Sequence, residues 1–166
     1  SALVTLIDDP LLKSRLGSYL YDGEGVPGKT KCLIKNGRLN AYLYDSYTAA
    51  KAQVKSTGNS IRHSLKAEPQ IGSSNLYLQP GKLSPQKIIR SISKGILITN
   101  MLGLHTADTI SGEYSFGAAG QLIENGKIIR PVKNLAIAGK LLDLLSSIAA
   151  IGNDLLFASS TGAPSV

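Results

Sequence analysis

The stretch QLIENGKI at residues 121–128 decides the fold class, because an Asn-Gly pair stands between two apolar runs. Asn and Gly are the residue types that most readily adopt the positive φ angles of a two-residue hairpin turn. A closely similar stretch, CLIKNGRL, occupies residues 32–39. The sequence therefore predicts two β-hairpins, with Asn36-Gly37 at one tip and Asn125-Gly126 at the other.

Each predicted hairpin leads into a predicted helix. The first begins at Asp45 or Ser46, which can cap it, and runs to about residue 54. The second covers about residues 140–151, where apolar side chains fall on one stripe. A third helix begins at Ser84-Pro85 and ends at Gly95. The predicted fold is α+β, mainly antiparallel sheets with two pseudo-repeated hairpin–helix units and about three helices, in a single domain over residues 1–166.

Further short strands are predicted at residues 3–7, 75–79 and 95–101, and the return strand of the first hairpin at residues 38–44. Residues 55–74 are polar and rich in glycine, which predicts a long surface loop. Asp8 and Asp9 precede Pro10 and are expected to form a turn.

The composition indicates an ordinary globular protein, with 43% hydrophobic and 17% charged residues. No run approaches the roughly 20 apolar residues that span a bilayer, so no membrane partner is expected. The single cysteine, Cys32, favours a cytoplasmic location. The first residues lack a signal-peptide pattern and are interpreted as a strand cut in mid-protein.

The formal net charge of +7 raises nucleic-acid binding as one hypothesis. The basic residues are spread from Lys13 to Lys140 without long runs or interleaved stacking aromatics. A solvated basic surface is therefore the preferred interpretation, and a basic nucleic-acid-associated module without enzymatic activity remains the alternative.

The residues that could bind a catalytic metal are few. A catalytic zinc site needs about three protein ligands, and the chain offers His63, His105 and Cys32, with no two at the i, i+4 spacing. The sequence therefore predicts no catalytic residue, no metal site and no cofactor in this chain. A cysteine hydrolase using Cys32 stays open as a third hypothesis and would require a reactive thiol.

Seven short blocks follow one another along nearly the whole chain. They are residues 3–10 (LVTLIDDP), 56–59 (STGN), 75–81 (NLYLQPG), 112–115 (GEYS), 122–126 (LIENG), 136–142 (AIAGKLL) and 151–154 (IGND). In order and spacing these blocks resemble the TldD/PmbA family, whose members were once called modulators of DNA gyrase and are understood as metallopeptidases.

The resemblance implies a division between two kinds of subunit. TldD-like subunits carry an HExxxH helix and a later cysteine that hold the metal, and TldE/PmbA-like subunits pair with them. In residues 157–164 (FASSTGAP), where the TldD type has its cysteine, this chain has Ser159, Ser160 and Thr161. The chain therefore looks like the C-terminal domain of a TldE/PmbA-type subunit, a fragment of a longer protein. Phe116 stands where many relatives have Arg.

The resemblance also implies the partners and the cofactor. They are a TldD-like metallopeptidase subunit that carries zinc, an extended or unfolded peptide substrate, and a homodimer when the fragment is alone. The loops that could contact peptide contain Ser56, Thr57, Gly58, Asn59, His105, Thr106, Ser115, Gly117 and Gly120. Plain turn chemistry is the alternative reading of each of these loops.

Overall fold

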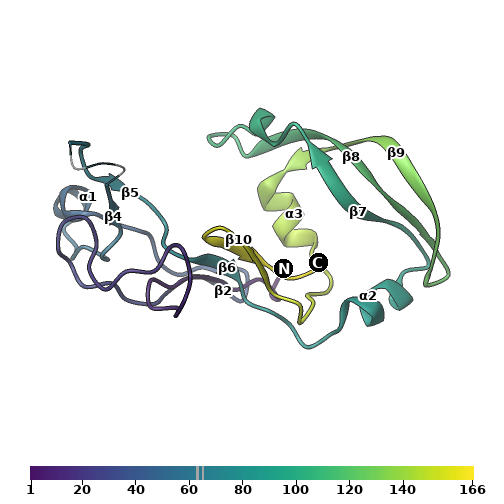
Figure 1. The fold of residues 1–166 in the computed structure, drawn as a ribbon, viewed down its shortest axis with the longest axis horizontal. Coiled ribbons are helices and arrows are strands. Elements are labelled where there is room, and N and C mark those ends of the chain that lie inside the picture. The colour runs from purple at the N-terminus through teal and green to yellow at the C-terminus, as the bar shows by residue number, and fades with distance from the viewer. Residues whose placement is uncertain (63, 65) are drawn as a thin grey trace. The chain divides into compact units, whose positions relative to one another are not determined.

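The computed structural model describes residues 1–62, 64 and 66–166, so His63 lies outside the described residues. The chain divides into two compact units (Figure 1). The host unit consists of Ala2–Pro80 and Leu155–Pro164. The inserted unit consists of Gly81–Asp154 together with Ser1 and Ser165–Val166. The chain thus leaves the host unit after Pro80 and returns to it at Leu155.

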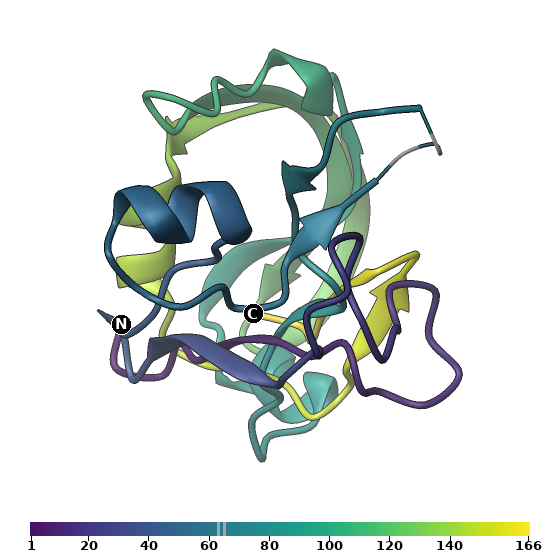
Figure 2. The same cartoon turned by 90° about the vertical axis from the view of Figure 1, so that its left-hand side faces the viewer.

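A six-stranded sheet forms the centre of the host unit. All its neighbouring strands are antiparallel except β11 and β6, which pair in parallel. A two-stranded ladder and one helix complete the unit, on the side that faces the viewer in Figure 2. The sheet order is β10 (Leu156–Ala158), β11 (Thr161–Ala163), β6 (Leu76–Leu78), β1 (Leu6–Asp8), β2 (Lys31–Lys35), β3 (Arg38–Leu39); the other elements are α1 (Ser46–Lys51), β4 (Ser60–Ile61) and β5 (Gln70–Ile71).

A three-stranded antiparallel sheet forms the centre of the inserted unit, with β8 between its neighbours. Its strands are the longest of the chain, and Figure 1 shows them side by side. The elements of this unit are α2 (Pro85–Ser91), β7 (Lys94–Leu102), the 3-10 helix η1 (Leu104–Thr106), β8 (Glu113–Glu124), β9 (Lys127–Lys140) and α3 (Leu141–Ser147).

Both Asn-Gly turns form as predicted. Asn36 and Gly37 have φ angles of 50° and 76°, and Asn125 and Gly126 have 50° and 73°. Each hairpin is followed by a helix, and the α+β class with mostly antiparallel sheets is confirmed. The hairpins themselves differ, because β2 and β3 have 5 and 2 residues whereas β8 and β9 have 12 and 14. They also belong to different sheets.

The helix starts follow the predicted caps. The Asp45 carboxylate accepts from the Thr48 hydroxyl and from the Thr48 N–H, and these bonds lower the pKa of Asp45. Ser84 caps α2, since its side chain accepts from the Lys87 N–H. All three helices end earlier than predicted, at Lys51, Ser91 and Ser147. None of these described helices is long and apolar enough to cross a membrane.

Several predicted strand bounds are wrong. β1 is displaced from residues 3–7 to Leu6–Asp8. The return strand stops at Leu39, because the N–H groups of Asn40 and Ala41 both donate to the Leu33 carbonyl and turn the chain away from the ladder. Residues 55–74 are not one continuous loop, since β4 and β5 pair within them.

Candidate functional site

A buried polar network surrounds Asp8 in the host unit. Asp8 ends β1, and its side chain is 0% exposed. One carboxylate oxygen accepts from the Ser74 N–H at 2.6 Å and from the Ser74 hydroxyl at 2.8 Å. The other accepts from Asn59 Nδ2 at 2.8 Å and lies 3.2 Å from Lys31 Nζ. The expectation that Asp8 only forms a turn is wrong, because its carboxylate joins distant segments.

Asp9, its neighbour, behaves as the sequence predicted. Its carboxylate accepts from the Leu11 N–H at 2.9 Å and from the Thr30 hydroxyl at 2.8 Å. This local bond two residues onward is the usual side-chain contribution to an Asx turn. Asp8 and Asp9 therefore do not form a carboxylate pair directed at one reacting group.

Residues 56–59, predicted to contact peptide, are held tightly to the host sheet. The Thr57 hydroxyl accepts from the Tyr44 N–H at 2.8 Å and lies 2.8 Å from Asn59 Oδ1. The Ser56 hydroxyl donates to the Tyr44 carbonyl at 3.2 Å. Lys31 Nζ donates to the Thr57 carbonyl at 3.1 Å. The polar groups of this segment are thus occupied in positioning the segment itself.

Gly58 is required at its place for two reasons. Its φ is 70°, and a Cβ there would lie 2.6 Å from the Pro27 carbonyl oxygen. The Gly58 carbonyl accepts from the Tyr19 hydroxyl at 2.7 Å. Burial, followed by the negative charges of Asp8 and Asp22, raises the pKa of Tyr19 to about 12. Tyr19 therefore stays a neutral hydrogen-bond donor at physiological pH.

The predicted residues of the inserted unit lie around η1 and β8. The structure brings Thr106 and Ser115 together, since the Thr106 hydroxyl lies 2.9 Å from the Ser115 carbonyl and 2.8 Å from that of Gly103. His105 is exposed within η1. The arrangement closes a short connection between β7 and β8, and it leaves the imidazole on the surface.

Ser115, Gly117 and Gly120 do not lie in a loop, so that prediction is wrong. All three belong to β8, whose register shifts between Ala118 and Gly120. A Cβ at Gly120 would lie 2.2 Å from the Leu97 carbonyl oxygen of the adjacent strand. Gly120 permits close backbone approach at an irregularity of the ladder, and the glycines of this segment do not form a turn.

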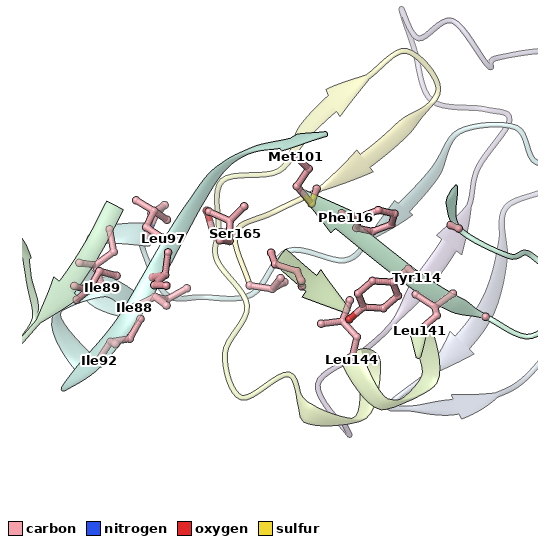
Figure 3. Close-up of a pocket in the computed structure, with 18 of the residues that line it drawn as sticks. Ile88, Ile89, Ile92, Leu97, Met101, Tyr114, Phe116, Leu141, Leu144 and Ser165 are labelled. Carbon is pink, nitrogen blue, oxygen red and sulfur yellow. The ribbon is translucent and has the colours of Figure 1, made fainter. Parts of the chain in front are cut away.

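An apolar cavity of about 750 Å³, which the sequence did not reveal, lies in the inserted unit. Isoleucines of α2 line one side, and side chains of β8 and α3 line the other (Figure 3). The rings of Tyr114 and Phe116 stack there, with centroids 5.1 Å apart. The labelled lining residues are Ile88, Ile89, Ile92, Leu97, Met101, Tyr114, Phe116, Leu141, Leu144 and Ser165.

The available signal for this cavity was the apolar face of the helix that begins at Ser84. Ile88, Ile89 and Ile92 form that face, and they line the cavity. The volume lies within the range of about 300–1,000 Å³ typical of ligand sites. Such a surface can accept the apolar side chains of a ligand, whereas it offers little for recognising charge.

The described residues contain no group of three or more His, Cys, Asp or Glu side chains that could hold a metal ion. Cys32 lies in β2, where its thiol donates to the Ile34 carbonyl at 3.2 Å. The stretch that resemblance compares with a cysteine-bearing loop forms the β10–β11 hairpin, with Ser159 at φ 59° in its turn.

The comparisons with known proteins agree with this fold. The chain is 39% identical over 156 residues to "Metalloprotease TldD homolog" of Buchnera aphidicola subsp. Acyrthosiphon pisum, covering 93% of this chain and 32% of that protein. It is 34% identical over 152 residues to "Metalloprotease PmbA" of Escherichia coli O157:H7, covering 92% and 31%. The chain thus spans about a third of the length of these curated relatives.

Two solved structures are similar over 99% of this chain. A protein of Thermotoga maritima, described as a modulator of DNA gyrase, has a TM-score of 0.92 and 36% identity, with 37% of its own chain covered. TldE of Thermococcus kodakarensis has a TM-score of 0.86 and 29% identity, with 38% covered. The family model described as "PmbA/TldA metallopeptidase C-terminal domain" matches residues 1–166. The chain therefore belongs to the PmbA/TldA metallopeptidase C-terminal domain family.

Proposed function

We propose that this chain is the C-terminal domain of a TldE/PmbA-type subunit that lacks a metal site of its own. It works with a zinc-bearing, TldD-like subunit on unfolded or extended peptides. The observation that carries the proposal is the composition of residues 157–164, which contain Ser159, Ser160 and Thr161 and no cysteine. The relatives include both TldD-named and PmbA-named proteins, so the subunit type rests on this stretch.

Cys32 is poorly placed to substitute for the missing cysteine. In the six-stranded sheet, β2 is separated from β11 by β1 and β6. Adjacent strands are about 4.8 Å apart, which puts Cys32 on the order of 14 Å from the stretch around Thr161. Metal–thiolate bonds are only about 2.3 Å long. The geometry therefore supports a division of labour in which the metal chemistry belongs to the other subunit.

Two features of the inserted unit support binding of an extended peptide. Within the described residues, β7 and β9 each pair only with β8, so each has an outer edge of backbone groups. A peptide can add to such an edge as a further strand. The apolar cavity lies beside the same sheet and could receive apolar side chains of the bound peptide.

The test compares the full-length protein, the TldD-like subunit and their mixture. We expect stoichiometric zinc only in the TldD-like subunit, measured by plasma mass spectrometry, because zinc sites need about three ligands. Cleavage of an unfolded peptide should require the mixture. Stoichiometric zinc in this protein alone, or cleavage by it alone, would refute the proposal; a His105→Ala variant then tests whether His105 is a ligand.

Peptide binding can be tested separately with variants of the cavity. Leu144 is exposed on α3, and Leu144→Asp puts a charge into the apolar lining. We expect weaker binding of an unfolded peptide. Leu142→Asp is the matched control, because Leu142 lies on the same helix and is 77% exposed, outside the lining. Equal binding by both variants would remove the cavity from the proposal.

Nucleic-acid binding is the second candidate function, but the charge distribution gives it little support. The host unit has ten basic and six acidic residues, and the inserted unit has eight and five. The charge of +7 is therefore divided into +4 and +3. Protein–nucleic acid affinity falls steeply with salt because neutralised phosphates release counterions. We expect no such salt-dependent binding in a mobility assay.

We also propose a cytoplasmic location for this protein, because its sequence has a single cysteine.

A further inference from the structure

A second cavity, of about 440 Å³, lies within the host unit and plays no part in the proposal above. Its walls come from residues 16–19, 21–23 and 60–62, and from Ser73, Ser159 and Ser160. It is smaller and more polar in its residues than the apolar cavity, because serines and a guanidinium contribute to it. Its volume falls within the range of about 300–1,000 Å³ found for small ligands.

Ser60 is the residue of this wall that most strongly indicates a ligand. It is 1% exposed, and its hydroxyl is a buried polar group that has no hydrogen-bond partner in the described part of the chain. Its N–H donates to Asp22 Oδ2 at 3.0 Å, which fixes the backbone behind the hydroxyl. Buried polar groups in native proteins nearly always have partners, so an unpaired one calls for a reason.

Asp22 and Arg62 are the charged side chains among the described residues that line this cavity. The Asp22 carboxylate is largely engaged by backbone groups, since it accepts from the N–H of Ser60 and also from the N–H groups of Glu24 and Val26, both at 2.9 Å. It is therefore committed to holding the loop, and it leaves little acceptor capacity to attract a cationic ligand.

The Arg62 guanidinium has more N–H donors than the hydrogen bonds that it makes to the described residues. Its Nε donates to the Gly23 carbonyl at 2.9 Å, and its Nη1 donates to the Ala67 carbonyl at 3.3 Å. A guanidinium carries five N–H donors, so two bonds anchor it and others remain. Ser60, in β4, and Arg62, just after it, both line the cavity. The cavity thus combines the remaining guanidinium donors with an unpaired hydroxyl, beside an Asp22 carboxylate that is already engaged by backbone N–H groups.

We propose that this cavity binds the C-terminal carboxylate of a peptide. The planar fork of a guanidinium matches the two oxygens of a carboxylate, and hydrogen bonds between these two charged groups are the strong ones. The free donors of Arg62 and the Ser60 hydroxyl bind the carboxylate oxygens. Leu16, Tyr21 and Ile61 supply apolar surface for the last side chain. The inference rests on the proposed function in assuming a peptide ligand, and it names the end that is recognised.

Binding to the full-length protein, without the TldD-like subunit, tests this inference by calorimetry. The probes are an N-acetylated tetrapeptide ending in leucine, its C-terminal amide, and an amidated tetrapeptide with an internal glutamate. We expect the free acid to bind about tenfold more tightly than either amidated peptide, since charge-assisted hydrogen bonds are the strong ones. Equal affinity of the acid and its amide overturns the inference, as does preference for the internal glutamate.

Three variants show whether the preference for the free acid depends on the cavity itself, on positive charge in general, or on the stability of the protein. Arg62→Gln should abolish the preference for the acid, while Arg38→Gln, which removes an exposed arginine on β3 of the same unit, should retain it. Ser60→Ala should weaken binding of the acid severalfold without lowering the melting temperature, because the hydroxyl has no protein partner to lose. Equal effects of Arg62→Gln and Arg38→Gln overturn the inference.

The outcome is distinguishable from failure of the proposed function. These binding measurements use neither metal nor the second subunit. Loss of the acid preference with cleavage by the mixed subunits intact would refute only the carboxylate site. A clear acid preference in a protein that cleaves peptides alone would refute only the division of labour between the subunits.

Discussion

Replacing Asp8 by asparagine should destabilise the host unit strongly. The change turns one carboxylate oxygen into an NH2 group, while the partners Asn59 Nδ2, Lys31 Nζ and the Ser74 N–H are all donors. In either orientation of the introduced amide, its NH2 group therefore faces at least one N–H donor instead of an acceptor. The Lys31 side chain, only 10% exposed, also loses its negative partner. Removing one member of a buried ion pair costs about 3–5 kcal/mol.

Hydrogen exchange resolved by mass spectrometry is the suitable assay, because it reports on each unit separately. We expect exchange at residues 57–62 and 72–78 to accelerate about a hundredfold or more in the Asp8→Asn variant, since each 1.4 kcal/mol is about tenfold. The strands of the inserted unit should change little. A second change, Lys31→Met, should restore part of the loss, because it removes the unpaired ammonium.

The matched control is the exposed pair in the inserted unit. Lys140 Nζ and Glu113 Oε1 are 3.3 Å apart, nearly the distance found at Asp8, but their side chains are 59% and 61% exposed. Glu113→Gln should cost less than about 1 kcal/mol. If Asp8→Asn cost no more than Glu113→Gln, the reasoning from burial and hydrogen bonding would be refuted.

Two further predictions concern backbone strain and alkaline pH. Gly126→Ala should lower the melting temperature more than Gly103→Ala. Both glycines have positive φ, but only at Gly126 would a Cβ meet a backbone oxygen, that of Arg90 at 2.7 Å. Equal losses in melting temperature would contradict this. Tyr19 has its pKa raised from 10.0 to about 12, so the unfolded chain loses this proton first and stability falls as pH rises from 10 towards 12. Tyr19→Phe should reduce that fall in alkaline unfolding curves, and an unchanged fall would contradict the assignment.

The parts of the fold that depend on neighbouring residues could be predicted from the sequence. The two Asn-Gly turns formed because positive φ is a property of those residues alone. The helix starts at Asp45 and Ser84 followed from caps that act within three residues. The helix ends were harder to predict, and all three helices stop before the predicted residue.

The candidate site depended on partners far apart in the chain. Asp8 bonds to Asn59 and Ser74, which are 51 and 66 residues away, and no local pattern indicates such pairing. Glycine misled the prediction for residues 115–120, because its permissiveness serves a turn and a crowded strand equally well. The stretch STGN at residues 56–59 joins the buried network through Asn59, and its contact with peptide stays a prediction.

The parallel pairing of β11 with β6 has a consequence for how the protein is made. The ribosome delivers β1, β2 and β6 early, but β11, the parallel neighbour of β6, and β10 beyond it are synthesised only after all of residues 81–154. The three-stranded sheet, in contrast, is complete in sequence once Lys140 has emerged. The two ends of the inserted segment are hydrogen-bonded to each other, since the Gly81 N–H donates to the Gly152 carbonyl at 2.7 Å. Because the chain is synthesised from its N-terminus, the inserted unit can fold first, whereas the six-stranded sheet is completed only after β10 and β11 have been made.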